Sequence, residues 1–289
     1  MRCDFCFNSG IRSDLPDISL KDFGILLEKL KNETSVTAID IMGGEPFLHD
    51  GIGSIIETSL SEGFNVNIST NGTLPEKITS LRNINGKLRL GISINTYEQV
   101  EKTEGLIRKL MPLVKTVYSP DLDWRMIHYL GSLPVSGYYI LYPDDLKSGE
   151  VRRFTGFEGF YREFSGDDSP FSGMVYCSGF IPDIEEYPLL ERLRCPAGSI
   201  KIGIMPDGSV YPCNLFFGLQ EFMLGNVLHE PIEKILSDER LRFFREFRGN
   251  SCPRRDCSIF SRCHGGCPAH SYIHYGSLNA PEPRCMEGL

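Results

Sequence analysis

Cysteine is the residue whose number and spacing in this chain point most directly to chemistry. Ten cysteines occur among 289 residues, and only Cys3 and Cys6 lie in the first 176. We expect a cytoplasmic protein, and in a reducing compartment cysteines are more often metal ligands than disulfides. The sequence therefore predicts a metal-binding region in the C-terminal part, built from Cys177, Cys195, Cys213, Cys252, Cys257, Cys263, Cys267 and Cys285.

The spacing of these C-terminal cysteines indicates that they act in groups. Cys195 is followed after twelve residues by Gly208, and Cys213 follows after four more. The stretch IKIGIMPDGSVYPC is typical of a β-hairpin that turns near Gly208 and places Cys213 at a strand end near Cys195. Four thiolates hold a 4Fe–4S cluster fully, and cysteine pairs also hold zinc, so both kinds of site stay open at this point.

Small and polar residues follow three strand-like segments in the N-terminal half. Residues 43–47 read GGEPF, residues 69–73 read STNGT and residues 93–96 read SINT. Two glycines let a backbone approach a ligand closely, and the Glu45 carboxylate can accept hydrogen bonds from an ammonium group. We expect the three segments to meet at one pocket, because the carboxyl ends of parallel strands lie at the same edge of a sheet.

The elements that must position these residues alternate between strands and helices. Short β-branched or apolar runs predict strands at 35–42, 64–70, 87–95, 113–118 and 136–142. Apolar residues at helical spacing predict helices at 20–30, 52–60 and 97–111. Repeated βα units of this kind predict a parallel sheet with helices outside it.

Charge and hydropathy exclude two classes of partner. The net charge of −8 gives nucleic acid no broad basic face to bind. No apolar run approaches the ~20 residues that a membrane span requires. We therefore expect neither a nucleic acid nor a membrane as a partner.

Together with Cys3-Asp4-Phe5-Cys6, the glycine-containing segments resemble the radical S-adenosylmethionine (radical SAM) superfamily. That family's cluster motif is C-x3-C-x2-C with an aromatic residue before the last cysteine, and Cys3, Phe5 and Cys6 match its last part. The first cysteine of the motif would lie two residues before Met1. We therefore expect Met1 to correspond to an internal residue of a longer protein, whose first barrel strand and one cluster ligand would precede this chain.

The C-terminal cysteines resemble the SPASM extension found in the same superfamily. Its pattern is C-x9–15-G-x4-C, a gap, C-x2-C-x5-C-x3-C, a gap and C; all positions are present here, with four residues instead of two between Cys252 and Cys257. The resemblance implies an α/β fold, in which a partial (β/α)6 barrel spans residues 1–145, a linker spans 146–194 and a small α+β SPASM domain spans 195–289.

The resemblance also implies the cofactors and their ligands. Cys3 and Cys6 would be two of three ligands of a 4Fe–4S cluster that binds S-adenosylmethionine (SAM). The SAM molecule itself would contact Phe5, Gly43, Gly44, Glu45, Pro46, Thr70, Asn71, Ser93 and Asn95. A first auxiliary 4Fe–4S cluster would be held by Cys195, Cys213 and Cys267, with Cys177 as the candidate fourth ligand. A second would be held by Cys252, Cys257, Cys263 and Cys285.

By the same resemblance, the chain would cleave SAM reductively to a 5′-deoxyadenosyl radical and abstract hydrogen from a peptide or protein. A flavodoxin or ferredoxin would donate the electron. Formylglycine formation ranks low, because Asn214 follows Cys213 where the maturases that catalyse it carry an aspartate. Two alternatives stay open: a non-catalytic iron–sulfur protein for electron transfer or scaffolding, and a zinc-stabilised interaction protein.

Overall fold

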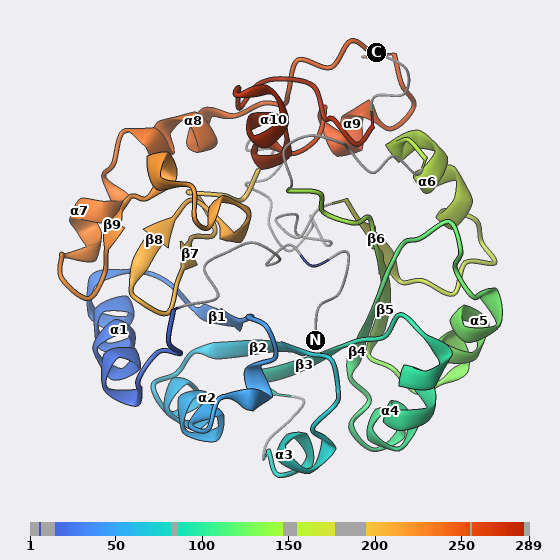
Figure 1. Ribbon diagram of the computed structural model, residues 1–289, viewed down its shortest axis with the longest axis horizontal. Coiled ribbons are helices and arrows are strands. Elements are labelled where there is room, and N and C mark those ends of the chain that lie inside the picture. Colours follow the sequence, from blue (N-terminus) through green and yellow to red (C-terminus); the bar gives the residue numbers. More distant parts are fainter. Residues whose placement is uncertain are drawn as a thin grey trace.

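A six-stranded parallel sheet forms the N-terminal part of the protein (Figure 1). The computed structural model describes residues 6, 15–81, 86–146, 155–176, 195–254 and 256–285. The strands lie in chain order and are β1 (Ala38–Ile41), β2 (Asn65–Thr70), β3 (Leu88–Ser93), β4 (Leu113–Val117), β5 (Gly137–Leu141) and β6 (Gly173–Val175). The first five coincide with the predicted strands, and the predicted parallel sheet is confirmed.

The sixth strand lies within residues 146–194, which we expected to be a linker. β6 is only three residues long and pairs in parallel with β5, so that Gly173 lies opposite Tyr139. A run this short gives no periodicity from which a strand could be predicted. The sheet therefore continues into the segment between the two expected domains.

Helices cover the outer face of the sheet, as the alternating pattern predicted. They are α1 (Leu20–Glu33), α2 (Ile52–Ser61), α3 (Pro75–Thr79), α4 (Tyr97–Leu110), α5 (Trp124–Ser132) and α6 (Phe157–Phe164). Ser19 caps α1 by accepting a hydrogen bond from the Asp22 amide, and Thr96 with Gln99 forms a full capping box at the start of α4. Among the described residues, none of the helices is long and apolar enough to cross a bilayer.

The alternation of side chains places polar residues of β2 on the inner face of the sheet. In β2, Val66 and Ile68 are buried toward the helices, while Asn67 and Ser69 point to the opposite face. Figure 1 shows the strands as an arc with the helices outside it, so the polar face lines the concave side. The concave side is therefore suited to a polar ligand.

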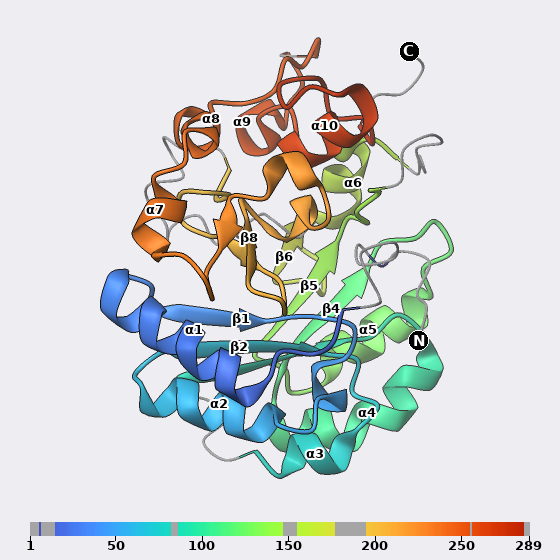
Figure 2. The ribbon, with the colours of Figure 1, turned by 60° about the vertical axis from the view of Figure 1, so that its left-hand side comes forward.

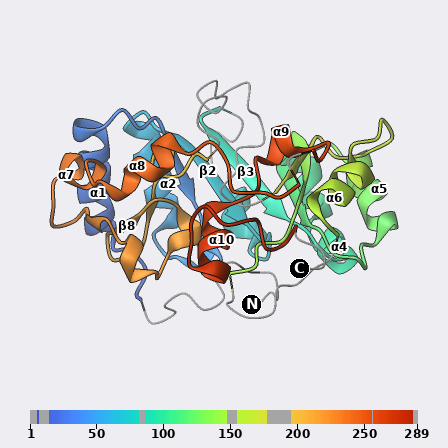
Figure 3. The same ribbon diagram turned by 90° about the horizontal axis from the view of Figure 1, so that it is seen from above.

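The C-terminal module lies on the open side of this arc (Figures 2 and 3). It contains an antiparallel sheet of β7 (Gly203–Ile204), β8 (Ser209–Tyr211) and β9 (Gly225–Asn226). Its α-helices are α7 (Ile232–Leu236), α8 (Arg240–Glu246), α9 (Phe260–Cys263) and α10 (Pro268–Tyr275). The predicted hairpin is confirmed, because β7 and β8 pair around a turn that ends at Gly208.

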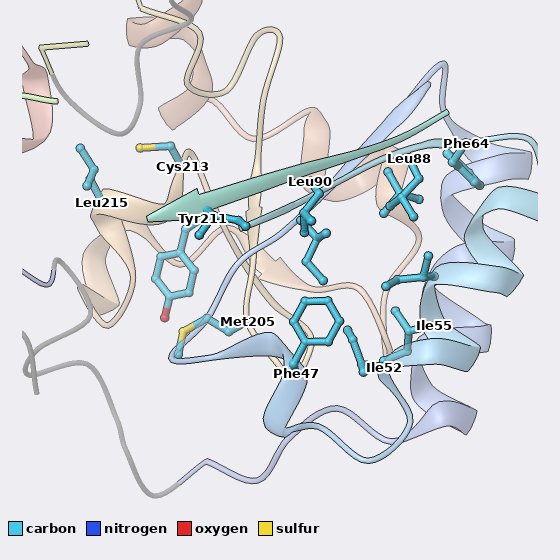
Figure 4. Packing of buried hydrophobic residues seen from close by; sticks show 14 of the residues in the cluster. Phe47, Ile52, Ile55, Phe64, Leu88, Leu90, Met205, Tyr211, Cys213 and Leu215 are labelled. Atoms are coloured by element: carbon cyan, nitrogen blue, oxygen red, sulfur yellow. The ribbon is translucent and has the colours of Figure 1, made fainter. Parts of the chain in front are cut away.

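The two parts of the protein share one hydrophobic core. Phe47 and Ile52 of the N-terminal part belong to the same buried cluster as Met205 and Tyr211 of the module (Figure 4). Lys29 of α1 adds polar contacts, since its ammonium donates to the carbonyl oxygens of Val227 at 2.6 Å and Glu230 at 2.8 Å. The module is thus fixed against the beginning of the sheet.

The hairpin turn gives the first testable prediction. Gly208 has φ +84°, and a Cβ there would lie 2.7 Å from Asn226 Oδ1 and from Leu228 Cγ. We expect Gly208→Ala to lower the free energy of unfolding by about 1–2 kcal/mol or more, because a side chain is disfavoured in the left-handed region. Urea unfolding followed by circular dichroism measures the loss.

The matched control is Gly53→Ala in α2, where a Cβ would meet no heavy atom of the described chain within 4 Å. Alanine in a helix is favoured over glycine by about 0.5–1 kcal/mol, so this variant should be as stable as the parent or more stable. Equal losses in the two variants would contradict the account of the turn.

Candidate functional site

Glu45 joins the ends of the first two strands at the carboxyl edge of the sheet. Its Oε1 accepts hydrogen bonds from the Phe47 amide at 3.1 Å and the Thr70 hydroxyl at 2.7 Å, and its Oε2 accepts from the Asn71 amide at 2.7 Å. The structure thus brings Glu45, Thr70 and Asn71 together, as the strand-end argument predicted. Their contact with SAM stays a prediction.

The two glycines before Glu45 border open space. At both Gly43 and Gly44, an added Cβ would meet no heavy atom of the described chain within 4 Å. Pro46, by contrast, is buried and begins a short 3-10 helix, η1 (Pro46–Leu48), which the Glu45 side chain caps. The backbone of this segment can therefore be approached by a ligand while its end is held rigidly.

Asn95 connects the end of β3 to β4. Its Oδ1 accepts a hydrogen bond from the Val117 backbone amide at 2.8 Å, and the Asn95 backbone amide donates to Gln99 Oε1 at 2.6 Å. Ser93 lies two residues earlier, in register with Lys115 on β4. Ser93 and Asn95 are half-buried at the same edge as Glu45, so all three strand ends contribute to it.

Lys115 is a candidate that the sequence analysis missed. Its ammonium crosses above Gly91 on β3 and donates to Ser69 Oγ on β2 at 2.5 Å. Burial lowers the pKa of Lys115 to about 8, although the negative charge of Asp40 opposes this effect. The signal in the sequence was a lysine inside the apolar run LVKTV, at a position that faces the concave side.

Three of the predicted site residues lie outside the described residues. They are Cys3, Phe5 and Cys177. Cys6 is described and is a half-buried free thiol. The predicted roles of these four residues therefore stay predictions.

Cys195, Cys213 and Cys267 lie close together in the module, and we name them the first thiol set. Burial raises the pKa of the Cys195 thiol well above its ordinary value, and the neighbouring charges of Cys267 and Cys213 raise it further. Burial likewise raises the pKa of Cys213 to about 12, against the opposing effect of Lys201. A cationic group bound between these sulfurs would supply the charge that makes them thiolates.

Cys252, Cys257, Cys263 and Cys285 form the second thiol set. Burial raises the pKa of Cys263 to about 12 and that of Cys285 to about 11, and both thiols are influenced by Cys252 and Cys257. Cys252 therefore lies with the other three, even though four residues separate it from Cys257 instead of two. The structure groups the seven thiols as the resemblance implied; their binding to iron stays a prediction.

The described cysteines are all free thiols, so none of them forms a disulfide. No three His, Cys, Asp or Glu side chains in the described residues converge closely enough to hold one metal ion.

A buried ion pair links the two thiol sets. Glu282 Oε2 accepts a hydrogen bond from the amide of Cys267, in the first set, at 2.9 Å. Arg284, the residue before Cys285 of the second set, donates from Nε to Oε1 at 2.8 Å and from Nη2 to Oε2 at 3.0 Å. Both side chains are almost completely buried. The geometry is the bidentate one that arginine and carboxylate favour.

The same ion pair holds the module against the loop after β5. Arg284 Nη1 donates to the Pro143 carbonyl at 2.9 Å, and the guanidinium lies over the rings of Tyr142 and Phe157 at 5.5 and 5.2 Å. Burial alone would raise the pKa of Glu282, but Arg284 and His270 outweigh it and lower the pKa to about 2. Glu282 is therefore ionised at neutral pH.

Sequence reasoning missed Glu282 and Arg284 as well. They lie in the proline-containing stretch APEPRC. Charged residues in such a stretch are ordinarily exposed. Nothing in their local pattern indicated that they pair with each other.

We expect Arg284→Met to destabilise the protein by about 3–5 kcal/mol, because it leaves Glu282 as a buried carboxylate without its cation. The double variant Glu282→Gln with Arg284→Met should be more stable than the single variant, since only one buried carboxylate is then left beside the lost guanidinium, that of Asp144. Urea unfolding of the anaerobically reconstituted protein at pH 7 measures both.

Arg242→Met is the control for this cycle. Arg242 is exposed and pairs with Glu239 and Glu246 on the surface, where ion pairs contribute about 1 kcal/mol or less. If Arg284→Met cost no more than Arg242→Met, the buried pair would not have the structural role described here.

Two segments of the chain match protein-family models. Residues 1–116 match the radical SAM superfamily, and residues 195–268 match SPASM, an iron–sulfur cluster-binding domain. These segments contain the sheet edge at Glu45 and all of the first thiol set. The predicted resemblance to the superfamily and its extension is confirmed.

Two relatives that match most of the chain are named for bacteriocin biosynthesis and for mycofactocin maturation. The chain is 25% identical over 92% of its length to the antilisterial bacteriocin subtilosin biosynthesis protein AlbA of Bacillus subtilis, and spans 64% of that protein. It is 21% identical over its full length to the mycofactocin maturase MftC of Mycobacterium tuberculosis, of which it covers 80%.

Solved structures share the fold. Streptococcus suis SuiB bound to its precursor peptide SuiA has a TM-score of 0.75 and 17% identity, with 99% of this chain and 73% of SuiB covered. SuiB bound to SAM has a TM-score of 0.70 at the same identity, with 99% of this chain and 75% of SuiB covered. At this level of identity the likeness shows the fold.

Proposed function

Because this chain belongs to the radical SAM superfamily and carries a SPASM domain, we propose that it is a peptide-modifying enzyme that cleaves SAM reductively. The observation that carries the proposal is the grouping of seven thiols into two sets beside a sheet whose strand ends form a polar edge. The three cysteines of the first set and the four of the second fit two auxiliary iron–sulfur clusters.

The sheet edge would bind SAM through residues at the ends of three strands, β1, β2 and β3. Gly43 and Gly44 leave space for the methionyl ammonium beside the backbone, and Glu45 offers a carboxylate that Thr70 and Asn71 hold in place. Pro46 fixes the end of this segment. Ser93 and Asn95 would contact the ribose or the carboxylate, and Phe5 would lie beside the adenine.

We add Lys115 to these residues as a cation for the methionyl carboxylate. It is in register with Ser93, and its ammonium is held on the concave face by Ser69. Charge-assisted hydrogen bonds to a carboxylate are among the strongest that a side chain offers. A half-buried ammonium on the concave face, beside the residues proposed for SAM, would therefore bind the negative end of the methionine.

When bound and reduced, the 4Fe–4S cluster together with SAM would supply the chemistry that removes a hydrogen atom from the substrate. The protein would position the reactants and shield them from solvent. Cys3 and Cys6 would be ligands of that cluster. The first thiol set, with Cys177, would hold one auxiliary cluster and the second set the other. A flavodoxin or ferredoxin would supply electrons.

A peptide is the substrate class that the comparisons favour. AlbA and MftC are named for bacteriocin biosynthesis and mycofactocin maturation, and SuiB was solved with a precursor peptide. The polar concave face, with Asn67, Ser69 and Arg89, offers hydrogen-bonding groups to a peptide. We keep the division into a catalytic part (1–145), a connecting part (146–194) and a cluster-binding part (195–289), with β6 joining the second to the first.

The proposal predicts about eight irons per chain from the two auxiliary clusters after anaerobic reconstitution. With a reductant, the loaded protein with a complete SAM-binding cluster should convert SAM to 5′-deoxyadenosine. Iron and sulfide analysis and chromatography of the products measure these outcomes. Iron loading without cleavage would instead support an electron-transfer or scaffold protein, and zinc without iron would contradict the proposal.

Lys115→Met should weaken SAM binding about tenfold, because it removes a charge-assisted hydrogen bond from a partly buried site. Anaerobic calorimetric titration of the reconstituted protein with SAM gives the dissociation constant. Lys102→Met is the control, since Lys102 is exposed and pairs with Glu98 on the outer face of α4. An unchanged dissociation constant in Lys115→Met would remove Lys115 from the site.

A further inference from the structure

The hydroxyl of Tyr176 is buried and has no hydrogen-bond partner among the residues that the structure describes. Tyr176 directly follows β6, and the whole residue is 8% exposed. A buried hydroxyl without a partner costs about 1–3 kcal/mol. Native structures rarely keep such a group unless a water, an ion or a ligand satisfies it.

Three other buried tyrosines near the sheet have hydroxyl groups with hydrogen-bond partners. Tyr142 donates to the Thr155 carbonyl at 2.6 Å, Tyr138 shares a hydrogen bond with Thr116 at 3.0 Å, and Tyr118 donates to Glu163 at 3.3 Å. Tyr176 therefore differs from these three tyrosines, because no acceptor for its hydroxyl lies in the described part of the chain.

The position of Tyr176 indicates which acceptor is absent. Its ring packs against Phe157 at 5.0 Å and Phe160 at 5.6 Å, in a buried cluster that also contains Cys263. Cys285 and Cys257 pack against the same cluster. The hydroxyl is close enough to Cys263 and Cys285 for their charges to act on it. It therefore lies beside the second thiol set.

We propose that the Tyr176 hydroxyl donates a hydrogen bond to a sulfur atom of the iron–sulfur cluster bound by the second thiol set. The inference rests on the proposed function, since it requires a cluster at that set. The sulfurs of such a cluster are acceptors, and they would be the partners that the hydroxyl lacks. Tyr176 contributes no ligand to the iron and acts on the cluster through this one bond.

A hydrogen bond of this kind would set the reduction potential of the second cluster. Hydrogen bonds to cluster sulfurs are one of the means by which proteins tune that potential. A donor favours the reduced form, because that form carries more negative charge on its sulfurs. Tyr176 would therefore make the second cluster easier to reduce.

The test is Tyr176→Phe in the reconstituted chain, which removes the hydroxyl and keeps the ring. In a redox titration followed by electron paramagnetic resonance, the ratio of reduced to oxidised second cluster at a fixed potential should fall about threefold. A change of this size lies within the net free energy that one hydrogen bond contributes. Pulsed resonance spectra should also lose one exchangeable proton coupling, identified by transfer to D₂O.

Tyr118→Phe is the matched control. The Tyr118 ring packs against Phe160 at 5.3 Å, as that of Tyr176 does, but its hydroxyl donates to Glu163. This variant should keep both the potential and the proton coupling. A second variant with 3-fluorotyrosine at position 176 should shift the ratio upward, because fluorine makes the hydroxyl a stronger donor.

The iron content of the reconstituted chain distinguishes a failure of the proposed function from a failure of this inference alone. A chain that binds no iron at the second thiol set would overturn both the proposed function and this inference. A loaded chain in which Tyr176→Phe leaves the potential and the proton coupling unchanged would overturn the inference alone. If the Tyr176→Phe variant binds no iron at the second thiol set, the variant with 3-fluorotyrosine at position 176 provides the test. An unchanged reduction potential in that variant would also overturn the inference.

Discussion

The ion pair between Glu282 and Arg284 is the interaction on which the arrangement of the C-terminal module depends. Its carboxylate accepts from the amide of Cys267 in one thiol set, and its guanidinium belongs to the residue before Cys285 in the other. The same guanidinium binds the loop after β5 through the Pro143 carbonyl. Two groups of thiols and the end of the sheet are therefore held by one buried pair, whose charges compensate each other only when both are present.

The Glu282–Arg284 pair and the segments that it joins bring together thiols that are not readily ionised by themselves. Burial raises the pKa of Cys213 and Cys263 to about 12, so at neutral pH these sulfurs become thiolates only with a bound cationic group. Metal binding would then contribute directly to folding, because the ligands come from segments that the unfolded chain does not hold together. The hydrophobic core shared by Phe47 and Tyr211 would transmit that stabilisation to the sheet.

The sequence allowed prediction of the elements whose pattern is local. Five strands, the hairpin before Cys213 and the strand-end segment at Glu45 each have a periodic or turn signal within a few residues. The roles of Lys115 and of the Glu282–Arg284 pair depend on contacts between distant segments. Lys115 of β4 reaches across β3 to Ser69 of β2 because Gly91 has no side chain in its path, and the ion pair is buried because the module folds over it. β6 is too short for any periodic signal.

The most direct measurement of the central claim is the iron content and Mössbauer spectrum of two reconstituted double variants, Cys195→Ala with Cys213→Ala and Cys257→Ala with Cys263→Ala. If the two thiol sets are separate cluster sites, each variant should lose about four irons. The two variants should also lose different components of the Mössbauer spectrum. If both variants lost the same signals, or if neither lost iron, the seven thiols would not form two cluster sites and the account would be wrong.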